Sequence, residues 1–240
     1  MPRANRYYHP GYVWHITHRC HKKEFLLKFD KDKMRWIHWL FEAKKRYGLC
    51  VLNYTVTSNH IHLLVYEKKT NTIPKSLQLI AGRVGQEYNN RKKRKGAFWE
   101  DRYQATLVDS ENYLVQCMVY IDLNMVRAGV ISHPKDWEFC GYHEIMNPKE
   151  RYSIIDHKML ISFFRFKNKK QLQVEYNGFV KQKLEIGTWA NEPNWSKSVA
   201  VGSEKFILEI QKKLGIKAEK RKIHRNKNHW ILNESEASYK

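Results

Sequence analysis

Apolar and polar positions along the first half of the chain predict a regular succession of strands and helices. Four segments rich in β-branched and aromatic side chains predict strands, at residues 12–19, 49–57, 60–67 and 102–108. Three segments with apolar side chains at helical spacing predict helices, at residues 30–47, 74–88 and 111–127. The order β-α-β-β-α-β with one further helix predicts an α+β fold, in which a ferredoxin-like antiparallel sheet carries an appended helix.

The chain beyond residue 150 has a different pattern. Helical periodicity occurs at residues 156–166, 171–183 and 203–214, whereas residues 187–198 have the composition of a Trp-bearing loop. The final residues are basic and then polar, which is typical of a mobile end. We therefore predict one domain at 1–150, a mostly helical extension at 151–216 and a basic, flexible tail at 217–240.

The composition indicates a polyanionic partner. The 240 residues include 44 Lys and Arg against 24 Asp and Glu, a net charge of +20. Such a charge attracts nucleic acid, because Lys and Arg contacts release counterions from phosphates, although a basic solvated surface has the same composition. No apolar run approaches the roughly 20 residues of a membrane span, and residues 1–8 lack an apolar signal core. The four cysteines form no CxxC pair, which favours a reducing, cytoplasmic location.

The segment His60-Ile61-His62 is the sharpest local motif. Side chains alternate along a strand, so the two imidazoles point to one side, with α-carbons roughly 7 Å apart. Ile61 then points into the core. Two imidazoles on one rigid face can share a metal ion; the alternative is a pair of ordinary polar residues on a half-exposed strand.

A second candidate group lies on the predicted helix at 111–127. Gln116, Tyr120, Asn124 and Arg127 recur at i, i+4, i+8 and i+11, which places them on one stripe of a largely apolar helix. Such a stripe is costly to bury unless its groups have partners. It offers a phenol that can attack, an amide oxygen that can bind metal and a cation that can hold phosphate; structural hydrogen bonds are the alternative.

The two groups complement each other. Two imidazoles and an amide oxygen leave coordination positions open for a substrate, and a divalent ion there would act as a Lewis acid on a phosphoryl oxygen. The amide oxygen and the phosphate favour Mg²⁺ or Mn²⁺, whereas the imidazoles favour a later transition metal. Mn²⁺ satisfies both preferences, and Mg²⁺ is more abundant.

Three ordered blocks, SNHIHLLV, FWEDRYQATLV and YLVQCMVYIDLNMVRAGV, resemble the REP-associated tyrosine transposases, relatives of the single-tyrosine HUH transposases of small bacterial insertion sequences. The opening PRANRYYHPGYVWHITHR is similar as well, so the resemblance covers roughly residues 2–145. It implies that Tyr120 is the nucleophile and that His60, His62 and Asn124 bind the metal. It further implies cleavage of single-stranded DNA at the foot of hairpins, through a 5′-phosphotyrosine and a free 3′-hydroxyl, with no nucleotide cofactor. Many relatives have Pro where this chain has Met125.

Several cations are candidates for contacts with DNA phosphates. They are Arg6, Arg19, Lys92, Lys93, Arg94, Lys95, Arg102 and Arg127. The expected partner is single-stranded DNA with hairpins, bound by a monomer or a homodimer.

Three alternatives remain open at this stage. His15, His18, Cys20 and His21 could form a second metal cluster. The chain could be a catalytically idle protein that only binds DNA or RNA hairpins. It could also be a phosphoesterase with paired His-x-Thr/Ser motifs, of which residues 15–17 (His-Ile-Thr) give one partial copy.

Overall fold

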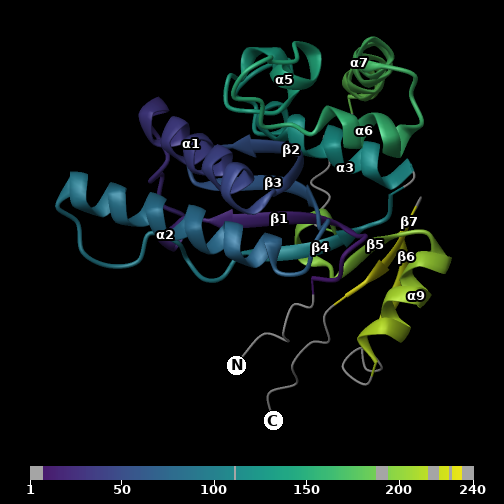
Figure 1. Cartoon of the computed structure of the whole chain (residues 1–240), viewed down its shortest axis with the longest axis horizontal. Coiled ribbons are helices and arrows are strands. Elements are labelled where there is room, and N and C mark those ends of the chain that lie inside the picture. Colours follow the sequence, from purple (N-terminus) through teal and green to yellow (C-terminus); the bar gives the residue numbers. More distant parts are fainter. Residues whose placement is uncertain (1–7, 111, 188–193, 216–221, 227–228, 234–240) are drawn as a thin grey trace.

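A seven-stranded sheet runs through the computed structural model, which describes residues 8–110, 112–187, 194–215, 222–226 and 229–233 (Figure 1). Its strands are β1 (Val13–Arg19), β2 (Cys50–Val56), β3 (His60–Tyr66), β4 (Gln104–Val108), β5 (Ala200–Gly202), β6 (Ile223–Asn226) and β7 (His229–Leu232). They lie in the order β2-β3-β1-β4-β5-β7-β6, and every neighbouring pair is antiparallel except β4 and β5. The first four strands have the ferredoxin-like arrangement, which confirms the predicted fold class.

The helices of the described residues are α1 (Asp30–Tyr47), α2 (Thr72–Lys92), α3 (Asn112–Asp122), α4 (Asn124–Arg127), α5 (Tyr142–Met146), α6 (His157–Phe164), α7 (Lys169–Ile186), α8 (Asn194–Lys197) and α9 (Glu204–Leu214). Two short 3-10 turns lie at His21–Lys23 and Pro134–Asp136. Among the residues described, no helix is both long and apolar enough to cross a membrane.

The two faces of the sheet differ in chemistry. Ile16, Ile61 and Leu63 are buried on one face, where Trp36 of α1 lies against Tyr54 of β2 with ring centroids 6.4 Å apart. α2 packs beside α1. This apolar face is the one that the alternation in residues 60–67 predicts.

The opposite face carries polar side chains and is covered by α3. Asn53 donates a side-chain hydrogen bond to the carbonyl of Met118 (3.2 Å), and the Thr55 hydroxyl donates to that of Ile121 (3.1 Å). Thr55 pairs with His62 across β2 and β3. These contacts therefore fix α3 against the strand that bears the HxH motif.

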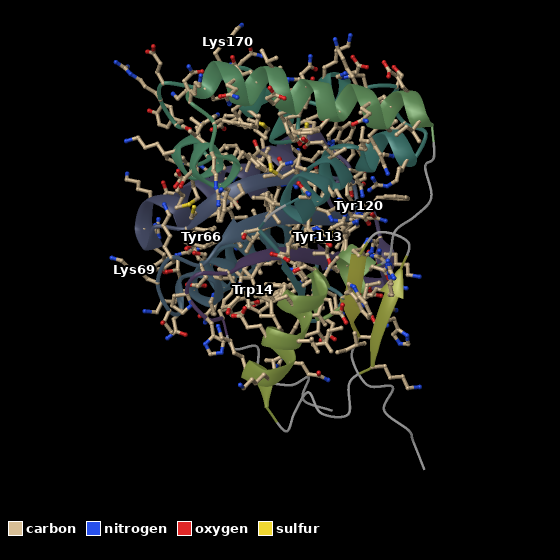
Figure 2. All side chains as sticks on the ribbon, turned by 90° about the vertical axis from the view of Figure 1, so that its right-hand side faces the viewer. Trp14, Tyr66, Lys69, Tyr113, Tyr120 and Lys170 are labelled. Atoms are coloured by element: carbon tan, nitrogen blue, oxygen red, sulfur yellow. The ribbon has the colours of Figure 1, made fainter. Side chains whose placement is uncertain are left out.

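α7 covers the outer side of α3 (Figure 2). The hydroxyl of Tyr176 donates a hydrogen bond to the buried carboxyl of Asp122. In Figure 2, Tyr120 lies beneath α7 and next to the strands.

Two helix boundaries differ from the predicted ones. α2 begins at Thr72, before Pro74, because the buried Glu67 carboxylate accepts hydrogen bonds from the backbone N–H groups of Thr72 (3.0 Å) and Ile73 (3.1 Å). The predicted single helix at 111–127 is interrupted at Leu123, whose φ of −79° and ψ of 7° are not helical. The backbone bonds from Leu123 to Val119 and from residue 127 to Leu123, both 2.9 Å, continue across this interruption.

The C-terminal part of the chain extends the sheet as well as adding helices. β5 pairs in parallel with β4, and β7 and β6 follow it (Figure 1). We predicted a flexible tail at 217–240, whereas its residues 223–226 and 229–232 are strands. β6 pairs with β7, its neighbour in sequence, whereas β7 also pairs with β5, which lies further away in sequence and which a local pattern does not mark.

Side chains also join this part to the ferredoxin-like core. Thr106 donates to the carbonyl of Ser198 (2.7 Å), and the hydroxyl of Ser203 donates to Asp109 (2.7 Å). Packing contacts therefore cross the predicted domain boundary at residue 150.

Candidate active site

A tight turn between β2 and β3 positions the first imidazole. The backbone N–H of Thr57 donates to the carbonyl of His60 (2.9 Å), and the Thr57 hydroxyl oxygen accepts from the N–H of His60 (3.1 Å). The Oδ1 atom of Asn59 lies 2.7 Å from Nδ1 of His60. Because an amide oxygen only accepts, this His60 nitrogen carries the hydrogen, and Nε2 keeps a lone pair.

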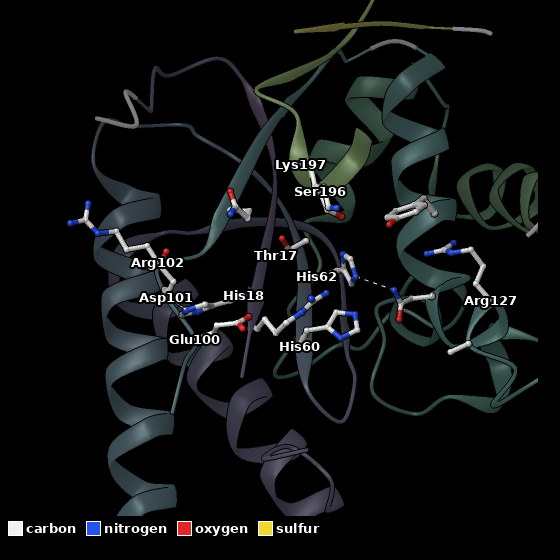
Figure 3. A pocket seen from close by; sticks show the side chains of 15 residues that line it. Thr17, His18, His60, His62, Glu100, Asp101, Arg102, Arg127, Ser196 and Lys197 are labelled. Atoms are coloured by element: carbon white, nitrogen blue, oxygen red, sulfur yellow. Dashed lines mark hydrogen bonds between the residues drawn. The ribbon is translucent and has the colours of Figure 1, made fainter. Parts of the chain in front are cut away.

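His62 lies two residues further along β3 and is buried, with 2% of its surface exposed. Its ring centroid is 5.1 Å from that of His60. Nε2 of His62 lies 3.0 Å from the side-chain nitrogen of Asn124 on α4. The HxH strand and the helix with the carboxamide therefore meet, as the two motifs together predict (Figure 3).

Tyr120 lies one helical turn before Asn124 and is 9% exposed. Its ring is perpendicular to that of His62, with centroids 5.9 Å apart. The guanidinium carbon of Arg127 lies 4.0 Å from the centre of the Tyr120 ring. This cation–π contact holds the guanidinium of Arg127 against the phenol ring.

These side chains line a cavity of about 620 Å³. Four cations surround it, Arg19, Arg102, Arg127 and Lys197, against the two acids Glu100 and Asp101. Arg102 and Arg127 lie on opposite sides of it (Figure 3). The cavity is large enough for a nucleotide-sized ligand and has a positive balance, which suits a phosphodiester.

Burial keeps the histidines of the site neutral. Desolvation, followed by the nearby Arg19 and Arg127, lowers the pKa of His60 to about 4. Burial and then the neighbouring His60 lower the pKa of His62 well below its usual value. Neutral imidazole is the form that binds a metal.

The donor set fits a divalent ion. Across the described residues, no three His, Cys, Asp or Glu side chains are arranged to hold a metal, and beside His60 and His62 the amide of Asn124 is the group that could serve as a third ligand. The Oδ1 atom of Asn124 belongs to the same amide that already contacts His62. The amide oxygen suits Mg²⁺ or Mn²⁺, whereas the two imidazoles suit later transition metals, so Mn²⁺ is the ion that satisfies both kinds of ligand.

Only some of the other predicted site residues line the cavity. Arg19 and Arg102 line the cavity with Arg127, whereas Lys92, Lys93, Arg94 and Lys95 do not. Those four lie at and just after the end of α2, where Arg94 donates to the carbonyl of Ala97 (2.8 Å). Arg6 lies outside the described residues. Gln116, predicted on the stripe of Tyr120, is exposed and does not line the cavity.

The suggested second metal cluster does not form. His15 and His18 lie three residues apart on β1 and so face opposite sides of the sheet. A ring nitrogen of His18 contacts the carbonyl of Asp101 (2.8 Å), and its ring stacks on Trp99. His15 instead contacts His62, with their nitrogens 2.9 Å apart.

Sequence reasoning missed two parts of the site. The alternation along residues 12–19 places His15, Thr17 and Arg19 on one strand face, but only strand pairing shows that this face carries His60 and His62. Ser196 and Lys197 of α8 line the cavity from the C-terminal part of the chain. No local pattern marks them, because their proximity depends on the docking of α8 beside β4 and β1.

Comparison with known proteins finds one family model and similar solved structures. A family model described as "Transposase IS200 like" matches residues 9–124, the segment that holds β1 to β4, Tyr120 and Asn124. No curated protein matches the chain. The chain resembles the solved structure of a REP-associated tyrosine transposase bound to a REP hairpin, with a TM-score of 0.52 and 18% identity over 62% of this chain and 87% of that one. A candidate transposase from Deinococcus radiodurans R1 is 19% identical over 51% of this chain and 96% of that one, with a TM-score of 0.35.

The chain thus shares the fold of a REP-associated tyrosine transposase. Its residues 9–124 match the model of the IS200-like transposase family.

Proposed function

We propose that the chain is a metal-dependent transposase that nicks and rejoins single-stranded DNA beside hairpins, with Tyr120 as the nucleophile. The observation that carries this proposal is the meeting of Tyr120, His60, His62 and Asn124 in one cavity with a positive charge balance. A structural hydrogen-bond network alone would not need a cavity or converging cations.

The reaction follows from these positions. The Tyr120 oxygen forms a bond to phosphorus, and the bond from phosphorus to the 3′-oxygen breaks. The phenol proton passes to solvent, and the leaving oxygen takes up a proton to become a 3′-hydroxyl. The reverse attack by a 3′-hydroxyl releases Tyr120 and rejoins a strand, so the bond energy is conserved without a nucleotide cofactor.

The chain's own residues hold the substrate. His60, His62 and Asn124 would bind Mg²⁺ or Mn²⁺, and the bound ion would supply Lewis-acid polarisation of a phosphoryl oxygen. Arg127 lies against the Tyr120 ring and can contact the phosphate that the phenol attacks. Arg19, Arg102 and Lys197 can contact flanking phosphates around the cavity.

The hairpin part of the proposal is supported by the fold. The structure whose fold this chain shares is that of a REP-associated tyrosine transposase bound to a REP hairpin. The sequence blocks that resemble that family include the HxH segment and the Tyr120 segment.

A cleavage assay tests this function. Labelled DNA with a hairpin and a single-stranded flank is incubated with the full chain and Mg²⁺, Mn²⁺ or a chelator. We expect one fragment that ends in a free 3′-hydroxyl and another that is joined to the protein through its 5′-phosphate, both only with metal. Hairpin binding without cleavage under every metal supports the idle binding protein instead, and a free 5′-phosphate without an adduct supports the phosphoesterase.

A further inference from the structure

A buried chain of hydrogen bonds runs from His62 to the C-terminal part of the molecule. Nδ1 of His62 lies 2.9 Å from Nε2 of His15, and Nδ1 of His15 lies 2.6 Å from the backbone carbonyl oxygen of Trp195. The two rings are stacked, with centroids 5.1 Å apart, and His15 is 1% exposed. Trp195 belongs to α8, well outside the segment that matches the transposase family.

The carbonyl of Trp195 fixes the direction of every bond in this chain. A carbonyl only accepts, so Nδ1 of His15 carries a hydrogen. A buried imidazole stays neutral and has one ring hydrogen, so Nε2 of His15 has a lone pair. Nδ1 of His62 must then donate to it, and Nε2 of His62 keeps its own lone pair.

The contact on the cavity side agrees with this direction. The side-chain nitrogen of Asn124 lies 3.0 Å from Nε2 of His62, so it donates to that lone pair. All three bonds therefore run the same way, from Asn124 through His62 and His15 to Trp195, and each polarises the next.

We propose that His15 is a positioning residue of the metal site, and that the Trp195 carbonyl, acting through His15, holds His62 in the tautomer whose Nε2 lone pair faces the cavity. The metal role of His62 rests on the proposed function. The tautomer itself does not, because it follows from contacts present without metal.

The two histidines of the motif are thus supported in different ways. Nδ1 of His60 is held by Asn59 of its own turn, at 2.7 Å. Nδ1 of His62 is held through His15 by α8, which docks at the sheet where Thr106 donates to the carbonyl of Ser198 (2.7 Å). The C-terminal extension therefore supports one of the proposed ligands, and it also supplies Ser196 and Lys197 to the cavity.

Histidine tautomers can be measured by long-range ¹⁵N–¹H correlation NMR on the metal-free full chain. In the wild type we expect His62 wholly as the Nδ1–H tautomer, with a through-hydrogen-bond coupling between its Nδ1 and Nε2 of His15. That measurement needs no variant, so it holds even where a substitution at His15 prevents folding. An Nε2–H tautomer at His62, or a missing coupling, overturns the proposal.

Two substitutions then separate positioning from mere packing. In His15→Leu, the leucine fills the space but cannot accept the hydrogen bond from Nδ1 of His62. His62 should then populate both tautomers, and the affinity for Mn²⁺ should fall about 10- to 100-fold. His15→Gln can accept from His62 and donate to Trp195, so it should restore the single tautomer and the Mn²⁺ affinity. The matched control is His157→Leu, which removes another buried histidine, bonded to the carbonyl of Glu144 at 2.9 Å outside the cavity; it should leave the His62 tautomer unchanged.

The outcomes distinguish the two proposals. A His62 tautomer and Mn²⁺ affinity that are unchanged in His15→Leu overturn the positioning role. If the wild type has the expected tautomers but does not bind Mn²⁺, the result supports the buried chain of hydrogen bonds and contradicts the metal-dependent function.

Discussion

The side-chain nitrogen of Asn124 lies 3.0 Å from Nε2 of His62, and this contact joins α4, which directly follows the helix that carries Tyr120, to the strand that carries the HxH motif. Asn124 is the member of the proposed ligand set whose side chain has two separate uses. Its nitrogen donates to His62, and its oxygen is the atom suited to a metal.

Substitution of Asn124 should separate these two uses. Asn124→Leu removes the oxygen ligand, so the Kd for Mn²⁺ should rise about 10-fold or more, by analogy with losses at metal sites. Asn124→Asp keeps an oxygen ligand and should bind Mn²⁺ within a few-fold of the wild type. Titration calorimetry measures both, and wild-type affinity in Asn124→Leu would remove this residue from the ligand set.

Arg127 should matter more than a typical surface cation. Its guanidinium lies against Tyr120 and lines the cavity, so Arg127→Gln should lower single-turnover cleavage about 100-fold, as for the loss of one transition-state donor. It should also reduce the salt dependence of DNA binding by about one phosphate contact. Lys170→Gln, an exposed cation on α7, is the matched control (Figure 2). Equal effects of the two substitutions would show that Arg127 acts only through net charge.

Asp122 should make stability depend on pH. Burial raises the pKa of its carboxyl from 3.8 to about 7, against the opposing hydrogen bonds from Tyr176 and Asn53. Between these values the unfolded chain has lost a proton that the folded protein retains. Stability therefore falls as pH rises through this window, by up to about 1.4 kcal/mol per pH unit, and levels off above it.

Urea unfolding of the wild type and of Asp122→Asn from pH 4 to pH 8 measures this dependence. The asparagine cannot ionise, so the pH-dependent part of the free energy of unfolding should shrink in the variant. The same slope in both proteins would exclude Asp122 as its source.

Gly202 should be required for the junction between the two parts of the sheet. A β-carbon there would lie 2.5 Å from Cβ of Asp109 and 2.6 Å from Cδ1 of Phe206. Gly202→Ala should therefore destabilise the fold by about 1–3 kcal/mol through overpacking. Gly178→Ala, in the middle of α7 with nothing within 4 Å, should instead stabilise by about 0.5–1 kcal/mol. Thermal unfolding of the two variants tests whether their stabilities change in opposite directions. An unchanged stability of Gly202→Ala would show that the residues around Gly202 can move to accommodate a methyl group.

The sequence predicts those parts of the site that depend on local periodicity. Alternation along β3 places His60 and His62 on one face, and helical spacing places Tyr120, Asn124 and Arg127 on another. α1 and α2 cover the apolar face of the sheet, so the face that carries the HxH motif is left to the appended helix α3.

The parts that depend on distant contacts could not be predicted in this way. His15 looks like one member of a histidine-rich strand, and only the pairing of β1 with β3 places it behind His62. The carbonyl of Trp195 is a backbone atom that no residue type can mark. β5 has three residues, too few for a pattern, and it exists because β4 offers an unpaired edge.

Mapping of the covalent protein–DNA adduct tests the central claim most directly. The full chain is incubated with hairpin DNA and Mn²⁺, digested and analysed by mass spectrometry. We predict that the phosphodeoxynucleotide is attached to Tyr120, that Tyr120→Phe abolishes the adduct while hairpin binding remains, and that Tyr113→Phe, two turns earlier on α3, retains it. An adduct on another residue, or one that persists in Tyr120→Phe, would contradict the account.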